Sequence, residues 1–317
     1  ALTQGAATGD WPDACGGGIC AINSEITVRD CKIYGNSATV SGKHGAGAGI
    51  YLYGDCSPLI DNCQFVLNTA SAGGAGICSE YFCSPTVTNC TFDQNTGAAI
   101  YAFRWSDLNV NNCSFTENTG GIILEDFSTG HVEASNISRN SADSGAAINC
   151  LLHCQITLNS CTLWSNVATG NGGAIFCERD GRCVATNCEL SLNTSGQNGG
   201  AICCVGSALQ LVDSDVTANS ARGQGGGVFC GQDSEATIDE TNIAGNDAAW
   251  GAGVALCDNT GGNLTSCNFT KNSASSGGGA VFCQNYSSPR LLHCRITHNT
   301  VAGDTPVGGA GLYCEYC

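Results

Sequence analysis

Positive charge is scarce in this chain of 317 residues, which has 11 Lys and Arg against 27 Asp and Glu and a net charge of −16. Binding to nucleic acid depends on Lys and Arg that neutralise phosphates, and anionic membrane surfaces attract basic segments. Long apolar runs are also missing, since none approaches the roughly 18 residues of a membrane span. We therefore expect no nucleic-acid partner and no direct insertion into a membrane.

Metal-site motifs are scarce as well. Zinc sites use paired C-x-x-C motifs or His at ligand spacing, but the one C-x-x-C here is Cys314 to Cys317 and the five His are dispersed. We expect no bound metal and no cofactor. Methionine is absent even from position 1, and the small residue Ala1 stands first, as it would after removal of a signal peptide.

The chain is instead rich in glycine and cysteine, with 44 Gly and 24 Cys. An even and dense set of cysteines is typical of a disulfide framework, and disulfides persist in oxidising compartments. The composition therefore predicts a protein that is secreted or lies at the extracellular cell surface.

A repeat covers nearly the whole sequence. Each copy has a glycine pair, a small residue, an aliphatic residue and often a cysteine, followed by a Cys-x-aromatic (or aliphatic)-x-x-Asn element. Successive closing asparagines lie 22 to 32 residues apart, mostly 26 or 27. The spacing predicts an asparagine ladder within tight turns, made of Asn36, Asn68, Asn95, Asn118, Asn140, Asn166, Asn193, Asn219, Asn246, Asn272 and Asn299.

Short alternating runs fill each copy, and none extends to the apolar stripe of a helix. One copy is too short for a propeller blade but fits three short strands, one turn of a parallel β-helix. We predict an all-β, single-stranded parallel β-helix of about eleven coils, with a lead-in loop at 1–15 and the β-helix domain at 16–317. Its core would contain two ladders: Ile77, Ile175, Val228, Val281 and Leu312, and then Phe65, Phe92, Phe115, Leu163, Leu190, Ile243, Phe269 and Ile296.

Two motifs carry a resemblance to a known family. They are GGA with an aliphatic residue, as in Gly172–Ile175 and Gly199–Ile202, and F-x-x-N, as in Phe65–Asn68, Phe92–Asn95 and Phe115–Asn118. Over residues 16–314 the chain resembles the right-handed β-helix superfamily and, more closely, the polymorphic outer membrane protein type of repeat. The resemblance implies a right-handed β-helix with an adhesive or structural role at a cell surface. The chain differs from these proteins in its cysteine density and shows no region like their membrane anchor.

All 24 cysteines are disulfide candidates, and their pairing stays open. One predicted column follows the aliphatic residue: Cys20, Cys78, Cys150, Cys177, Cys203, Cys230, Cys257, Cys283 and Cys314. A second precedes the aromatic residue: Cys31, Cys63, Cys90, Cys113, Cys161, Cys188, Cys267 and Cys294. The others are Cys15, Cys56, Cys83, Cys154, Cys183, Cys204 and Cys317. Bridges between coils, such as Cys230–Cys257, and local ones, such as Cys78–Cys83 and Cys177–Cys183, compete with thiols that pack as small apolar residues.

Seven N-x-Ser/Thr sequons are candidates for N-glycosylation: Asn89, Asn112, Asn136, Asn193, Asn263, Asn268 and Asn285. Because Asn193 also closes a repeat, we expect it to be buried.

We find no pattern that indicates catalysis. The loop ERDGR at 178–182, with Arg179, Asp180 and Arg182, is the best candidate for contact with a sugar. Six acidic residues on two successive coils are a candidate for Ca²⁺ binding, namely Asp213, Asp215, Asp233, Glu235, Asp239 and Glu240. Ice binding is disfavoured because no Thr pair recurs from coil to coil.

The two ends carry no recognisable cap. A stack with open ends can pair with further copies, and head-to-tail contacts of this kind generate filaments. We therefore predict a non-enzymatic structural protein that polymerises with itself into a surface filament or appendage. The alternatives are an adhesin-like passenger that binds glycans or host proteins and, third, a polysaccharide-degrading enzyme.

Overall fold

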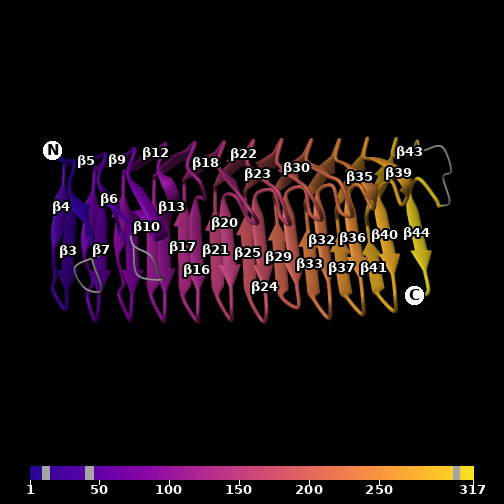
Figure 1. The fold of residues 1–317 in the computed structure, drawn as a ribbon. Helices are drawn as coiled ribbons and strands as arrows, with labels where there is room; N and C mark the ends of the chain where they lie inside the picture. The colour runs from indigo at the N-terminus through magenta and orange to yellow at the C-terminus, as the bar shows by residue number, and fades with distance from the viewer. Residues whose placement is uncertain (9–14, 40–45, 303–307) are drawn as a thin grey trace. The chain divides into compact units, whose positions relative to one another are not determined.

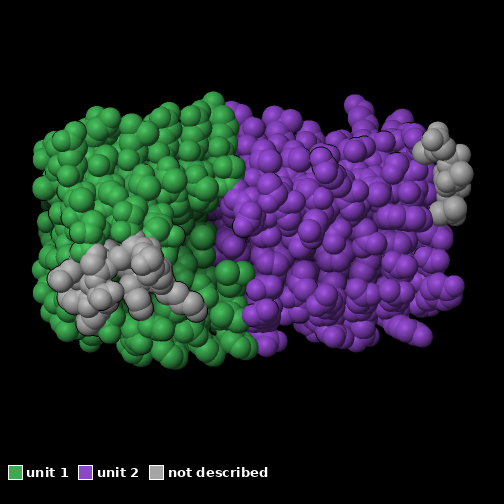
Figure 2. Space-filling view, in the orientation of Figure 1, with its two compact units in different colours: residues 1–141, 151–156 green, residues 142–150, 157–317 purple. Residues whose placement is uncertain are grey.

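The computed structural model describes residues 1–8, 15–39, 46–302 and 308–317, which form parallel β-strands joined by tight turns (Figure 1). No helix occurs in these ranges, so none is long and apolar enough to cross a membrane. The strands build a parallel β-solenoid of about eleven turns in all, which confirms the predicted fold class. The chain divides into two compact units, Ala1–Ser141 with Leu151–Ile156, and Ala142–Cys150 with Thr157–Cys317 (Figure 2).

Unit 1 contains three parallel sheets. Sheet 1 follows the glycine pairs and contains β2 (Ala6–Ala7), β3 (Ile19–Ile22), β6 (Ser37–Ala38), β7 (Ile50–Tyr53), β10 (Thr69–Glu80), β13 (Thr96–Phe103) and β16 (Ile122–Glu125). Sheet 2 contains β4 (Thr27–Arg29), β8 (Leu59–Asp61), β11 (Thr86–Thr88), β14 (Asp107–Asn111) and β17 (Thr129–Glu133). Sheet 3 contains β1 (Leu2–Thr3), β5 (Lys32–Tyr34), β9 (Gln64–Val66), β12 (Thr91–Asp93), β15 (Ser114–Thr116) and β18 (Asn136–Ser138).

Unit 2 repeats these sheets and adds a fourth. Its sheet 1 contains β24 (Ile175–Glu178), β28 (Ile202–Val205), β32 (Val228–Gly231), β36 (Val254–Cys257), β40 (Val281–Gln284) and β44 (Leu312–Glu315). Sheet 2 contains β25 (Arg182–Thr186), β29 (Ala208–Val212), β33 (Glu235–Asp239), β37 (Gly261–Thr265) and β41 (Ser288–Leu292). Sheet 3 contains β22 (Thr162–Trp164), β26 (Glu189–Ser191), β30 (Asp215–Thr217), β34 (Asn242–Ala244), β38 (Asn268–Thr270) and β42 (Arg295–Thr297).

The fourth sheet of unit 2 lies between each ladder asparagine and the next glycine pair. It contains β23 (Val167–Ala168), β27 (Thr194–Ser195), β31 (Ser220–Ala221), β35 (Asp247–Trp250), β39 (Ser273–Gly277) and β43 (Thr300–Val301). Three further strands include residues of both units: β19 (Ser141–Ala142), β20 (Ile148–Leu151) and β21 (Gln155–Asn159).

The predicted lead-in is not a plain loop. Its β1 pairs with β5 and its β2 pairs with β6, so residues 2–3 and 6–7 belong to sheets of unit 1. Residues 9–14 of this segment lie outside the described residues. The sequence does not reveal these pairings because strands of two residues are too short to show alternation.

The core contains both predicted ladders. In unit 1, Phe65, Phe92 and Phe115 are paired in register, fully buried and stacked face to face with centroids 4.6 and 4.7 Å apart. In unit 2, Ile175 belongs to an equally buried aliphatic series on sheet 1. Leu312 ends that series in register with Val281 and is 43% exposed, unlike its buried counterparts.

The closing asparagines form a buried hydrogen-bond ladder within each unit. The backbone N–H and the Nδ2 of Asn193 both donate to Oδ1 of Asn219, at 2.9 and 3.0 Å. Asn219 repeats this pattern with Asn246 and also donates from Nδ2 to the Leu190 carbonyl at 2.9 Å. Each amide thus satisfies groups of its own turn and of a neighbouring turn, as buried polar groups require.

Residues in the left-handed backbone conformation form the turns between the sheets. Between sheets 1 and 2 two such residues follow one another, as in Arg179 (φ 56°) and Asp180 (φ 59°), and a single one, such as Asn187 (φ 53°), joins sheets 2 and 3. Residues other than glycine rarely adopt this left-handed conformation, and each one that does destabilises the fold by roughly 1 kcal/mol. Backbone hydrogen bonds to the next turn compensate, as from Asp180 N to Gly206 O at 2.7 Å.

The glycine pairs serve two different requirements. Gly172 has φ +63°, and an added Cβ would lie 2.2 Å from the Ile175 carbonyl oxygen. The Gly173 backbone passes the next turn so closely that a Cβ would lie 2.1 Å from Gly200 O. The first glycine therefore supplies a left-handed bend, and the second allows the turns to approach.

We predict that Asn219→Asp destabilises the protein by about 3–5 kcal/mol at neutral pH, since the variant loses both Nδ2 hydrogen bonds and buries a carboxylate. Urea unfolding followed by circular dichroism measures this difference. Asn263→Asp makes the same chemical change at an exposed position of β37 and should stay within about 0.5 kcal/mol of the wild type. Equal stability of the two variants would contradict a structural role for the ladder.

Candidate functional site

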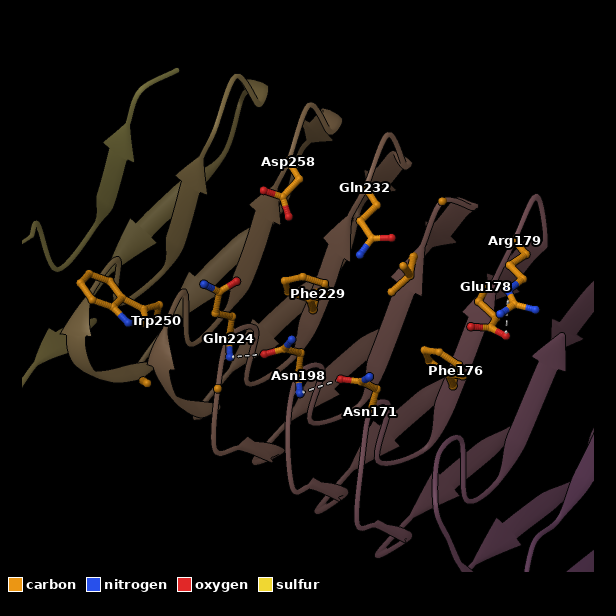
Figure 3. Close-up of a pocket in the computed structure, with 14 residues that line it drawn as sticks. Asn171, Phe176, Glu178, Arg179, Asn198, Gln224, Phe229, Gln232, Trp250 and Asp258 are labelled. Carbon is orange, nitrogen blue, oxygen red and sulfur yellow. Dashed lines mark hydrogen bonds and ion pairs between the residues drawn. The ribbon is translucent and has the colours of Figure 1, made fainter. Parts of the chain in front are cut away.

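A groove of about 790 Å³ lies on the outward face of sheet 1 in unit 2 (Figure 3). It is bounded by the turns that precede the glycine pairs on one side and by the turns between sheets 1 and 2 on the other. A volume of this size is within the usual range for ligand sites. It is therefore the candidate site of unit 2.

Aromatic side chains form part of the floor. Phe176 on β24 and Phe229 on β32 point outward, because their strand neighbours Ile175 and Val228 fill the core. Trp250, at the end of β35, is half-buried and packs against Phe282 with ring centroids 5.1 Å apart. These rings offer apolar surface next to polar walls.

Three amide side chains line one wall, one on each of three successive turns (Figure 3). Oδ1 of Asn171 accepts a hydrogen bond from Asn198 N at 3.1 Å, and Oδ1 of Asn198 accepts one from Gln224 N at 2.9 Å. Oε1 of Gln224 accepts from the thiol of Cys257 at 3.1 Å. Because each amide oxygen is already held, the orientation of each amide is fixed and its NH₂ group is the part available to a ligand. We name Asn171, Asn198 and Gln224 the amide row.

The opposite wall holds the charges. Glu178 and Arg179 lie in it as an ion pair, with 3.7 Å between Glu178 Oε1 and Arg179 Nε. Arg179 is followed two turns later by Gln232 and three turns later by Asp258, which also line the groove. With one cation and two carboxylates, the groove has no excess of positive charge.

Only part of the loop predicted to contact a sugar lies in the groove. Glu178 and Arg179 belong to the groove, whereas Arg182 lies on β25 and donates to Gln210 Oε1 at 3.0 Å outside it. The amide row and Trp250 were not among the site residues predicted from the sequence. A signal for the row was present, since an amide directly precedes the glycine pair in NGG at 171–173, NGG at 198–200 and QGG at 224–226.

The acidic residues predicted to bind Ca²⁺ do not lie together, and five of the six lie at opposite ends of sheet 2. Asp233 and Glu235 lie at the start of β33, whereas Asp239 and Glu240 lie at its end, next to the turn that holds Asp213. Asp215 on β30 instead accepts a hydrogen bond from Asn242 at 2.9 Å. Within the described ranges, no group of three or more acidic, His or Cys side chains is arranged to hold a metal ion.

The first predicted cysteine column is wrong by one residue at four of its members. Cys20, Cys78 and Cys203 directly follow the aliphatic residue of the ladder and Cys257 stands three residues after it, whereas the other members stand two residues after it. Cys204, not Cys203, is in register with Cys177 and Cys230, and Cys203 pairs instead with the outward Phe176 and Phe229.

Two of the bridges weighed from the sequence do not fit the register. Cys230 pairs with Leu256, and Cys257 with Gln284, so the pair Cys230–Cys257 is out of register. Cys78 packs with Cys15 and Tyr51, whereas the Cys83 thiol lies against Cys56, which disfavours Cys78–Cys83.

The second cysteine column lines the turn between sheets 2 and 3. The Cys63 and Cys90 backbone N–H groups donate to the sulfurs of Cys90 and Cys113, both at 3.4 Å. In the next position of the column Ser135 accepts the same bond, from Cys113 N at 3.0 Å. A hydrogen bond between the thiols raises the pKa of Cys90 to about 12 and lowers that of Cys113. These cysteines thus act as small acceptors that serine can replace.

The sequons differ in accessibility. Asn89, Asn112, Asn136 and Asn263 are exposed, Asn268 and Asn285 are half-buried, and Asn193 is fully buried in the ladder.

We predict that Asn193 carries no glycan in the folded protein, because both its amide and its backbone N–H are bonded inside the ladder. The test is to secrete the chain from a eukaryotic host and treat it with N-glycosidase, which converts each glycosylated Asn to Asp. Peptide mass spectrometry should find conversion among the four exposed sequons, with Asn263 as internal control, and none at Asn193. Conversion at Asn193 in the folded fraction would contradict the prediction.

Comparison with known proteins supports the fold. The family described as the right-handed β-helix region matches residues 17–175 and 146–315. A search of curated proteins and a search of solved structures each found no significant match. Because the family matches nearly the whole length and the strands form a parallel solenoid, the chain belongs to the right-handed β-helix family.

Proposed function

We propose that this is an adhesin-like protein, secreted or at the cell surface, that binds uncharged glycans in the groove of unit 2. The amide row carries the proposal, since it presents NH₂ donors from three successive turns in one line. Sugar hydroxyl and ring oxygens accept such hydrogen bonds, and the apolar faces of pyranose rings pack on aromatic side chains such as Trp250. A few placed polar groups over an apolar floor are typical of small-molecule sites.

The charges favour an uncharged ligand. The single cation of the groove, Arg179, is paired with Glu178, and Asp258 adds a further negative charge. The whole chain carries a net charge of −16. An anionic polysaccharide would meet net repulsion on approach, which lowers both its association rate and its affinity.

The periodicity of the row favours a polymer over a single sugar. Neighbouring turns of a parallel sheet are about 4.8 Å apart, so the three donors extend over about 10 Å. An extended oligosaccharide that runs across the turns can engage one donor after another. A monosaccharide cannot reach all three at once.

The carboxylates favour binding over cleavage. Glycosidases place two carboxyl groups about 5 to 9.5 Å apart across the scissile bond. Glu178 and Asp258 lie three turns apart, which corresponds to about 14 Å at about 4.8 Å per turn. Such a separation leaves neither carboxylate opposite the other as acid and nucleophile.

We predict that the protein is retarded in affinity gels that contain at least one uncharged polysaccharide among soluble glucans, xylans and mannans, and that pectate does not retard it. Asn198→Asp should weaken this binding at least about tenfold, because it keeps the oxygen that accepts from Gln224 but replaces the NH₂ donor with a charged acceptor. No reducing ends should appear during incubation with the bound polymer.

Asn263→Asp is the matched control, since it adds the same charge on an exposed strand outside the groove and should bind like the wild type. The thermal midpoint of each variant checks that the fold is intact. Equal binding by Asn198→Asp and the wild type, or no binding to any of the uncharged polymers, would refute the proposal.

A further inference from the structure

Two cysteines of unit 1 face each other across successive turns. Cys56 and Cys83 form an isolated parallel β-bridge just before the paired strands β8 and β11, and Ser84 N donates to Cys56 O at 2.7 Å beside it. Both side chains are buried, at 1% and 0% exposure, and their sulfurs lie 2.8 Å apart. This distance is well inside van der Waals contact for two unbonded sulfur atoms.

The surroundings do not relieve this close contact. The Cys83 thiol donates to the Gly54 carbonyl oxygen at 2.7 Å, so only the Cys56 proton is left for the contact between the two sulfurs. Neighbouring turns of a parallel sheet place Cα atoms about 4.8 Å apart, within the range of about 4.4–6.8 Å that disulfides use. Removal of both protons with formation of a sulfur–sulfur bond turns the close contact into a stable one.

A second pair of cysteines on successive turns shows that equal spacing in the repeat does not by itself indicate a disulfide. Cys63 and Cys90 are separated by the same 27 residues as Cys56 and Cys83. The Cys90 sulfur, however, accepts from the backbone N–H of Cys63 at 3.4 Å, and the Cys63 thiol donates to Asp61 O at 3.3 Å. The Cys63 and Cys90 thiols also interact with each other, but each has backbone partners at ordinary distances, so the pair provides a matched comparison.

The position of Cys56 and Cys83 does not require cysteine for the turn itself. The next two turns place Ser106 and Ser128 there, and the Ser106 backbone N–H donates to Ser128 Oγ at 3.2 Å. Each serine hydroxyl also donates to a carbonyl of its own turn, at 2.9 and 2.8 Å. A hydroxyl therefore completes this turn without a thiol.

We propose that Cys56 and Cys83 form a disulfide that joins two successive turns of unit 1 when the chain folds in an oxidising compartment. The two thiols lose two protons and two electrons to the disulfide of an oxidised thiol–disulfide exchange catalyst, which leaves as a dithiol. Burial raises the pKa of both thiols in the folded state, so exchange is slow once folding is complete. The bond closes a loop of 27 residues and restricts the unfolded chain.

Peptide mapping tests the pairing. The full chain is produced in a bacterial periplasm without reductant, denatured in the presence of N-ethylmaleimide, and cleaved before Asp and after Glu. Cys56 is then the only cysteine of peptide 55–60, and peptide 81–92 contains Cys83 and Cys90.

We expect the two peptides to be recovered as one species that is two hydrogens lighter than their sum, with the link assigned to Cys83 by fragmentation. Cys63 and Cys90 should carry maleimide. Maleimide on both Cys56 and Cys83, or a link from Cys56 to any other cysteine, would overturn the proposal.

Thermal unfolding distinguishes the stability that the disulfide contributes from the stability that side-chain packing contributes. The variant C56S/C83S keeps a hydroxyl at each position, and without reductant its midpoint should lie roughly 5–10 °C below that of the wild type. With reductant the difference should shrink, whereas C63S/C90S should respond to reductant as the wild type does. The same difference with and without reductant would assign the loss to packing and overturn the disulfide.

Discussion

Hydrogen bonding from each turn to its neighbour is the constraint on which the rest of this molecule depends. A solenoid turn of this length has no helix and few contacts within itself, so its buried polar groups must find partners on the adjacent turns. The asparagine ladder solves this with one residue, since Asn219 accepts from Asn193 and donates to Asn246 and Leu190. A partner of this kind works only if the same side chain recurs at the same place, which is why the sequence repeats.

The same constraint prepares the groove. In the amide row the oxygens of Asn171 and Asn198 are fixed by the backbone of the following turn, as in the ladder, but here the side chains lie at the surface. A structural bond therefore orients a donor that faces outward at no further cost in conformational freedom. Preorganised groups of this kind lose less entropy on binding a ligand. The regular spacing of the turns then carries over to the spacing of the donors.

Much of the fold can be predicted from the sequence, because its determinants recur. The register of Phe65 with Phe92 and the burial of Ile175 follow from the position of each residue in its repeat. The neighbouring cysteines Cys203 and Cys204 show the limit of prediction from the repeat. A shift of one residue along a strand reverses which side chain faces the core. A repeat with two adjacent cysteines gives no internal means to choose between them. The left-handed turns at residues such as Arg179 were equally hidden, because their stability comes from bonds to the next turn and not from local propensity.

The functional predictions were harder for a related reason. Repetition marks structural positions, whereas the groove depends on outward residues such as Phe229 and Trp250 that do not recur in every copy. The filament stays a prediction, since it concerns contacts with other copies of the chain.

The high cysteine content is also an ambiguous signal, because a buried cysteine can serve either as a disulfide partner or as a hydrogen-bond acceptor. The sulfur of Cys113 stands where Ser135 stands one turn later, and both accept a backbone hydrogen bond. Much of the cysteine in this chain can therefore serve as a small buried acceptor, and a disulfide is indicated only where two sulfurs face each other.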